Sequence, residues 1–351
     1  RPVRRQGKGN PHRVGTERPQ IQAAGLAIPA TKARMQDPAR FISHHNLPPS
    51  MESLAIVTQS YRNDIHECAL LCESIKRFVP GNIPHHIFVN DEDFRLFKEN
   101  PAFKGRHIHR KSEIMPWHHI QFPFKVLGHR YLVSPFTIPV REWIVQQICK
   151  LGAFEALGSG IEAVMNIDSE CVFLRPLESG DLIKDGKWIL FKGPFIDEPC
   201  HDEYCRVARR FMPLPPHQDI IGDCYMSHPV VFVRENIEAL LQSIASSSTF
   251  KSWKHRLCNT YRFSEYYCYG LFSDHVLGLK NHFLTDKHLF PLVDITHING
   301  KKALMSEIRH KMTSGNTPLG VWLQKSNRKS ASYLPFNDIH DTILEYWEQR
   351  K

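Results

Sequence analysis

The sequence of 351 residues lacks long apolar stretches. No segment approaches the roughly 18 to 20 uninterrupted apolar residues that a membrane-spanning helix needs. The first 30 residues also lack the apolar run of a secretory signal. We therefore expect a cytoplasmic protein that is at most docked peripherally on a membrane surface.

Cysteine pairs of the metal-binding or redox kind are also missing. The nine cysteines are scattered, and none of them forms a C-x-x-C pair. The group of Cys200, His201 and Cys205 lacks the matching second half of a structural zinc site. Several cysteines lie in apolar runs, where cysteine is usually a small core residue. We expect reduced thiols, as in other cytosolic proteins.

Acidic side chains are scarce in one part of the chain. Residues 1–50 contain nine Lys and Arg but only two acids, Glu17 and Asp37, and so carry +7 of the net charge of +9. Residues 51–351 are close to neutral, at +2, whereas nucleic-acid binders usually carry a basic footprint across the folded domain. We expect a disordered basic extension over residues 1–50 and no nucleic-acid partner.

The apolar pattern after position 50 predicts an open α/β sheet. Residues 54–58 have the pattern of a buried strand, 64–79 that of an amphipathic helix, and 86–90 that of a second strand. Strand, helix and strand in this order begin a sheet with right-handed crossovers. Ligands of such sheets bind beyond the carboxyl ends of the strands, here at residues 58–64 and 90–93. We expect one large domain over 51–330 and a last helix within 331–351.

A pair of carboxylates follows another apolar strand. We expect a helix over residues 141–157 and a strand over 163–168 that runs into Asp168. Asp168 and Glu170 are one residue apart, so both can approach one divalent cation directly or through water. Mg²⁺ and Mn²⁺ favour such oxygen ligands and bridge carboxylates to diphosphate oxygens. An isolated D-x-E is usually a solvated turn, but the apolar residues on both sides of this one favour a metal site.

The same segment resembles a known motif. Asp168-Ser169-Glu170 with residues 172–176 is similar to the D-x-D segment of GT-A glycosyltransferases, and the wider pattern resembles the DUF6492 group of bacterial glycosyltransferase-like proteins. The other matching pieces are residues 57–61, 143–151, 263–266 with 269–270, and 322–327, so that the resemblance spans residues 53–328. One departure is Glu170, where aspartate is usual. The longer side chain is expected to reach the metal through water.

The resemblance implies a GT-A-like fold, in which a Rossmann-like mixed sheet is flanked by helices. It also implies a metal-dependent glycosyltransferase that moves a sugar from a nucleotide-sugar donor to a glycan or another hydroxyl acceptor. The expected cofactor is Mn²⁺ or Mg²⁺, and a UDP-sugar is the expected donor because it is the commonest. Cell-surface polysaccharide synthesis is the expected pathway.

The resemblance also implies roles for particular side chains. The residues expected to bind the nucleotide and donor sugar are Thr58, Ser60, Tyr61, Asp64, Gln147, Lys150 and Asp168. Those expected to bind the metal are Asp168, Glu170 and His297. Glu265 lies among aromatic residues that would desolvate a carboxylate, which suits it to act as the general base on an acceptor hydroxyl. Asp274 and Asp223 are the reserve candidates for this base, and residues 227–229 are candidates for the acceptor cleft.

Two other functions stay open. A non-catalytic nucleotide- or carbohydrate-binding relative would keep the fold and lose turnover, and the departure at Glu170 favours it. A nucleotidyltransferase would also need paired carboxylates and a metal. It usually adds a Gly-rich basic loop after the first strand, and residues 59–62 are not such a loop. A role in DNA or RNA binding would rest on the basic extension alone.

Overall fold

A central sheet of five strands carries the site. The computed structural model describes residues 49–194, 199–215, 223–249, 251–313, 317–325 and 334–350, and this sheet has the strand order β13-β7-β1-β2-β3. Its strands are β1 (Leu54–Gln59), β2 (His85–Val89), β3 (His107–Arg110), β7 (Ala163–Asn166) and β13 (Val230–Val233). All neighbours are parallel except β13, which runs antiparallel to β7. The predicted mixed α/β architecture with a mostly parallel sheet is confirmed.

The start of this sheet forms as its apolar pattern predicts. β1 is buried at every position, as expected for a strand covered on both faces, and α1 (Ile65–Phe78) connects it to β2. The helix predicted over residues 141–157 is shorter, because α3 (Glu142–Leu151) ends at Gly152. A side chain at Gly152 would lie 2.5 Å from Ile114 Cγ2, so the chain passes close to its neighbours there and turns into a 3-10 segment.

Smaller sheets and further helices surround the central sheet. β8 (Cys171–Phe173) pairs with β16 (Gly320–Gln324), which pairs with β15 (Leu292–Asp294). β10 (Lys187–Phe191) lies between β9 (Ile183–Lys184) and β14 (His282–Thr285). A third sheet consists of β4 (Ile120–Gln121), β5 (Tyr131–Ser134) and β6 (Thr137–Arg141), and β11 (Gly193–Pro194) pairs with β12 (Asp223–Cys224). The remaining helices are α2 (Phe94–Glu99), α4 (Ser179–Leu182), α5 (Pro199–Arg209), α6 (Arg234–Ser246), α7 (Trp253–Cys258), α8 (Glu265–His275), α9 (Lys301–Thr313) and α10 (Phe336–Glu348).

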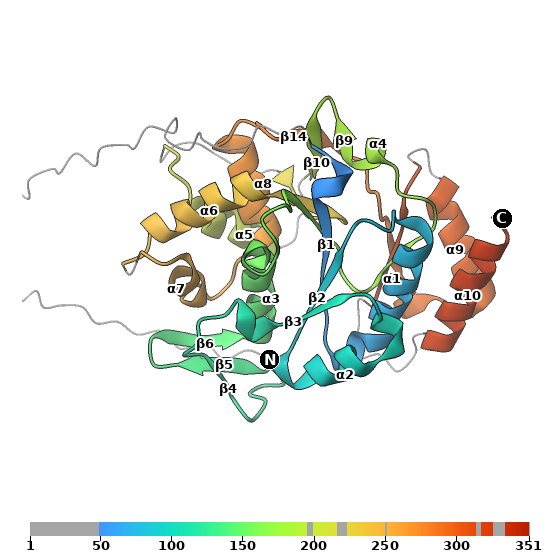
Figure 1. The fold of residues 1–351 in the computed structure, drawn as a ribbon, viewed down its shortest axis with the longest axis horizontal. Helices are drawn as coiled ribbons and strands as arrows, with labels where there is room; N and C mark the ends of the chain where they lie inside the picture. Colours follow the sequence, from blue (N-terminus) through green and yellow to red (C-terminus); the bar gives the residue numbers. More distant parts are fainter. Residues whose placement is uncertain are drawn as a thin grey trace, which may run out of the picture. The chain divides into compact units, whose positions relative to one another are not determined.

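The two faces of the central sheet pack against different elements. On one face, the ring of Phe232 in β13 contacts those of Tyr266 and Tyr269 in α8. On the other face, Ile56 of β1 joins a core that includes Trp188 of β10. Figure 1 shows α9 and α10 on the right and the β4–β6 sheet at the lower left. In the described residues, no helix combines the length and the apolar character that crossing a membrane requires.

The structure describes little of the N-terminal extension but most of the C-terminal segment. The basic extension predicted over residues 1–50 lies almost wholly outside the described residues, which begin at residue 49. The predicted last helix is present as α10 and packs on β8, because Trp347 Nε1 donates a hydrogen bond to the Phe173 carbonyl at 3.2 Å. The division into 51–330 and 331–351 stays a prediction.

Candidate functional site

A cavity of about 670 Å³ lies where the parallel strands end. Its walls come from the turn after β1, the turn after β2, the β4–β5 loop, the start of α3 and the D-x-E turn after β7. This is the edge at which open α/β sheets bind ligands. Four of the predicted site residues line this cavity, namely Tyr61, Asp64, Asp168 and Glu170.

Asp168 is held by the side chains of Lys150 and His228. Its Oδ1 lies 3.0 Å from Lys150 Nζ and its Oδ2 lies 3.3 Å from His228 Nε2. Burial acts to raise the pKa of Asp168, but the charges of Lys150 and His228 outweigh burial and hold this pKa well below its usual range. The carboxylate still has 34% of its side-chain surface exposed. Asp168 is therefore an ionised, oriented carboxylate at the cavity wall.

Lys150 connects Asp168 to the interior of the protein. Its Nζ lies 3.0 Å from Glu265 Oε1 and donates to the Tyr266 hydroxyl at 2.8 Å. Burial opposes the charge of this lysine, yet the carboxylates of Asp168 and Glu265 raise the pKa of Lys150 well above its ordinary value. Glu265 itself is buried, with 1% of its surface exposed. Lys150 therefore stays charged and joins a buried carboxylate to a partly exposed one.

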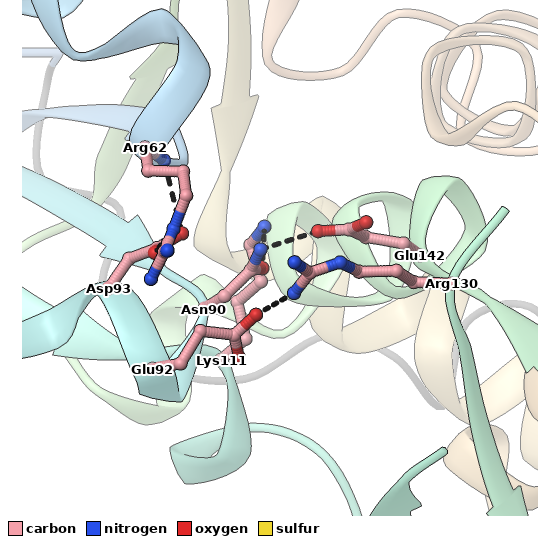
Figure 2. Close-up of polar contacts among 7 residues, drawn as sticks. All are labelled: Arg62, Asn90, Glu92, Asp93, Lys111, Arg130 and Glu142. Carbon is pink, nitrogen blue, oxygen red and sulfur yellow. Dashed lines mark hydrogen bonds and ion pairs between the residues drawn. The ribbon is translucent and has the colours of Figure 1, made fainter. Parts of the chain in front are cut away.

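A second network ties the cavity walls together (Figure 2). Arg62 donates from its backbone nitrogen and its Nε to the two oxygens of Asp93, at 3.0 and 2.5 Å. Asn90 donates to Glu142 Oε1 at 2.5 Å and accepts from Lys111 Nζ at 2.7 Å. These bonds fix the turns after β1 and β2 against the start of α3.

The β4–β5 loop is joined to the same network. Figure 2 shows Arg130 of this loop paired with Glu92, which follows β2. Lys125, His129 and Arg130 line the cavity together with Arg62 and Arg141. The cavity wall therefore carries several basic side chains opposite its carboxylates. The sequence alone does not indicate a role for Lys125, His129, Arg130 or Arg141, because residues 120–141 match no motif.

Several buried polar atoms near this edge lack hydrogen-bond partners among the described residues. They are both amide atoms of Gln59, both amide atoms of Asn166 and Nδ1 of His228. Gln59 ends β1, and Asn166 pairs in register with Val57 and Val230. Gln59, Asn166 and His228, which precedes β13, therefore all lie near the carboxyl edge of the sheet. An unsatisfied buried polar group costs about 1–3 kcal/mol. Such groups in a native protein usually indicate a site for water or a ligand.

Four predicted nucleotide-binding residues do not line the cavity: Lys150, which lies behind Asp168, and Thr58, Ser60 and Gln147. Thr58 is fully buried, and its Oγ1 is hydrogen-bonded to His85 Nε2 at 3.0 Å. Ser60 is 1% exposed, and Gln147 is buried with its Nε2 donating to the Trp143 carbonyl at 3.2 Å. Their sequence neighbours Gln59 and Gln146 face the cavity instead. The turn and the helix lie where the sequence predicts them, and the roles of Thr58, Ser60 and Gln147 in donor binding stay predictions.

The candidates for the general base are separated from Asp168 or buried behind it. Glu265 is enclosed and paired with Lys150, so it does not reach an acceptor hydroxyl from this position. Asp223 and Asp274 come together, since a carboxylate oxygen of each lies 2.9 Å from Lys192 Nζ. Asp274 also accepts from the Tyr225 hydroxyl at 2.7 Å. Asp223 and Lys192 line a different cavity of about 990 Å³.

Two of the predicted metal ligands fit a divalent cation, and the third does not. Asp168 and Glu170 both line the cavity. Mg²⁺ in nucleotide sites is usually held by one or two carboxylates plus phosphates. A carboxylate has about four lone-pair positions, so Asp168 can accept from Lys150 and still bind a cation. His297, at the end of the 3-10 turn Ile295–His297, is exposed and does not line this cavity.

No larger metal-binding group accompanies this carboxylate pair. Within the part of the chain that the structure describes, His, Cys, Asp and Glu side chains nowhere gather in threes as a metal centre would need. A cation at Asp168 and Glu170 would therefore have to complete its shell with oxygens of a bound ligand or water. This is the usual arrangement for Mg²⁺ with a nucleotide.

The fold is mixed α/β, and a cavity lies at the carboxyl edge of its mostly parallel sheet. The chain belongs to the family of unknown function DUF6492, whose model matches residues 51–308, and the predicted family is thereby confirmed. Among solved structures it is similar to mouse xyloside xylosyltransferase 1 in its apo form, at a TM-score of 0.38 and 8% identity over 78% of this chain and 98% of that chain. A likeness at this level does not assign an activity. No curated protein matches the chain in sequence.

Proposed function

We propose that this chain is a glycosyltransferase that binds a nucleotide-sugar donor in the cavity at Asp168. The observation that carries the proposal is the partly exposed Asp168 carboxylate, oriented by Lys150 and His228 at the end of a parallel strand. Lys125 and Arg141 on the cavity wall offer cations to an anionic ligand, and the cavity of about 670 Å³ has the size of a small-molecule site. A nucleoside diphosphate sugar has both the charge and the size.

A divalent cation at Asp168 and Glu170 is part of this proposal. When bound there, it would neutralise charge that develops on the departing nucleoside diphosphate. The residues of the chain would do the rest: the basic wall would bind the phosphates, and Tyr61 would offer a ring or a hydroxyl to the nucleoside. The acceptor is proposed to be a glycan or another hydroxyl compound.

Glu265 takes a different role in this proposal from that of a general base. A general base must come within hydrogen-bond reach of the proton that it removes, and Glu265 is enclosed behind Lys150. We assign it as a positioning residue, which keeps Lys150 charged and directed at Asp168. Of the two reserve candidates for the base, Asp223 is the more exposed, at 40% of its side chain, but it lines the separate cavity of about 990 Å³.

The proposal is tested first by ligand binding. The thermal midpoint of the protein is measured with a panel of nucleoside diphosphates and nucleotide sugars, each with and without Mn²⁺. A ligand that binds only the native state raises the midpoint as its concentration exceeds Kd. We expect at least one diphosphate to do so and Mn²⁺ to enlarge the shift. If no member of the panel binds, the proposal is wrong.

A matched pair of variants locates the binding. Asp168→Asn should weaken Mn²⁺-dependent nucleotide binding by more than about tenfold, since even residues one step removed from a metal typically cost that much. Asp341→Asn makes the same chemical change in a surface ion pair with Lys301 of α9 and should leave binding unchanged. Equal affinity of the two variants would remove Asp168 from the site.

Product analysis separates the competing functions. A glycosyltransferase releases a nucleoside diphosphate from a nucleotide sugar when an acceptor, or water in its place, takes the sugar. A nucleotidyltransferase instead releases pyrophosphate from a nucleoside triphosphate. A protein that binds the donor but releases neither product with any acceptor offered would be the non-catalytic relative.

A further inference from the structure

Large apolar side chains are exposed on and around the β4–β6 sheet. Eight of the twelve such side chains in the described part of the chain lie between residues 117 and 143. Trp117 is 91% exposed, Leu127 90% and Phe124 71%, and Ile120 on the edge strand β4 and Phe136 in the β5–β6 turn are also exposed. We call these five residues the apolar platform. Exposed patches of this kind usually mark a surface that contacts another molecule or a membrane.

Leu127 occupies an unusual position on this platform. It lies at the tip of the β4–β5 loop, in a tight turn closed by the bridge between Val126 and His129. Its φ of 50° is in the left-handed region that favours glycine, and Gly128 follows with a φ of 79°. Bulky residues rarely adopt this conformation. The loop therefore holds a large apolar side chain out into solvent, on a backbone that disfavours it.

The charge of this segment has one sign only. Residues 116–141 contain Lys125, Arg130 and Arg141, and no aspartate or glutamate. They also contain five aromatic residues. Aromatic side chains beside Lys and Arg are typical of proteins that sit at the interface of a membrane, where the rings enter the headgroup region and the cations meet anionic lipids.

We propose that the chain docks on an anionic membrane surface through the apolar platform. Phe124 and Leu127 of the β4–β5 loop enter the headgroup region, and Lys125, which is exposed, contacts lipid phosphates. Trp117 and Phe136, whose rings both contact His118, extend the apolar surface at the other end of β5. Lys125, Gly128 and His129 also line the candidate cavity, so docking places the mouth of that cavity beside the bilayer. This inference rests on the exposed residues and their charge, and it holds or fails independently of the proposed glycosyltransferase activity.

The test measures co-sedimentation of the full chain with vesicles of phosphatidylcholine, with and without phosphatidylserine. The perturbing variant is Phe124→Ser/Leu127→Gly, in which glycine relieves the left-handed backbone at position 127. The control is Leu284→Ser, which removes an exposed leucine from β14, at the opposite edge of Figure 1 from β4–β6. Thermal midpoints of both variants verify that they fold.

We expect wild type to prefer vesicles that contain phosphatidylserine and the double variant to bind them at least about tenfold more weakly, since burying one such side chain is worth about that factor. The control should bind like wild type. High salt screens the basic residues 1–50, so the difference between variants should persist in salt. Equal binding of the double variant and wild type would overturn the proposal. A second outcome would also overturn the proposal. If wild type does not bind vesicles but self-associates, and the double variant does not self-associate, the platform is a contact between two copies of the chain.

Discussion

Removing the charge of Lys150 should destabilise the protein strongly. The change Lys150→Met keeps the length of the side chain and leaves Glu265, whose side chain is 2% exposed, without its cation. Breaking a buried ion pair from one side costs about 3–5 kcal/mol, because it leaves an uncompensated charge in the interior. Glu265→Gln should cost less, about 1–2 kcal/mol, since Lys150 keeps Asp168 and the Tyr266 hydroxyl as partners. The double variant buries no unpaired charge at position 265.

A double-mutant cycle in urea measures this coupling. The free energy of unfolding of the four proteins is obtained from denaturation curves by linear extrapolation. We expect the double variant to be more stable than the sum of the single changes predicts, by about 1–3 kcal/mol. The exposed pair Lys301 and Asp341 is the matched control and should show no measurable coupling. Additive single changes at Lys150 and Glu265 would refute the reasoning that these two charges depend on each other.

The same variants separate positioning from proton transfer. If Glu265 acts through Lys150 and Asp168, Glu265→Gln should weaken donor binding as well as turnover, because the orientation of Asp168 is disturbed in the ground state. A general base would lower kcat alone and leave donor affinity unchanged. Unchanged affinity with a loss of kcat of about a hundredfold or more would return Glu265 to the role that its aromatic surroundings first indicated.

Two further predictions concern pH and side-chain direction. Burial, with His107 and His109 nearby, lowers the pKa of His86 to about 3, and burial lowers that of His282 to about 4. Both histidines are neutral in the folded state, whereas the unfolded chain takes up protons below pH 6.5. The free energy of unfolding is therefore highest above that pH and decreases as pH falls, by about 2 kcal/mol for each histidine at pH 5. Urea denaturation curves of His86→Gln should show a weaker dependence of stability on pH than those of wild type, and an equal dependence would contradict the assignment. Gln146→Ala should weaken nucleotide binding about fivefold at unchanged stability, whereas Gln147→Ala should lower the free energy of unfolding by about 1 kcal/mol and leave binding unchanged. The reverse pattern would show that the cavity is lined by the other face of α3.

Local patterns predicted the sheet well and the site only in part. The runs at residues 54–57 and 163–165 are apolar throughout and specify buried strands, and the carboxylate of Asp168 follows two residues after the end of β7. The turn after β1 was located for the same reason. A shift of one residue along a turn or a helix changes the direction in which a side chain points. The local pattern did not determine this direction, and Gln146 rather than Gln147 faces the cavity.

Contacts between distant segments could not be read from the sequence. Asp223 of β12, Asp274 of α8 and Lys192, which lies between β10 and β11, meet at one point although they are far apart in the sequence. The pairing of Arg130 with Glu92 likewise joins the β4–β5 loop to the turn after β2. No local pattern specifies such pairs, because each side chain alone has the properties of an ordinary surface charge.

Glu265 shows why a residue type and its neighbours do not fix a role. Tyrosines and Phe263 beside a carboxylate are what a desolvated general base would have, and they are also what a buried counter-ion would have. The two roles differ in whether a cation lies within ion-pair distance and whether the carboxylate is open to a ligand. Lys150, far away in the sequence on α3, lies 3.0 Å from Glu265 and decides the first point, and the 1% exposure decides the second. A buried carboxylate with a cation at 3.0 Å already has its partner, and its effect on a ligand must pass through Lys150 to Asp168.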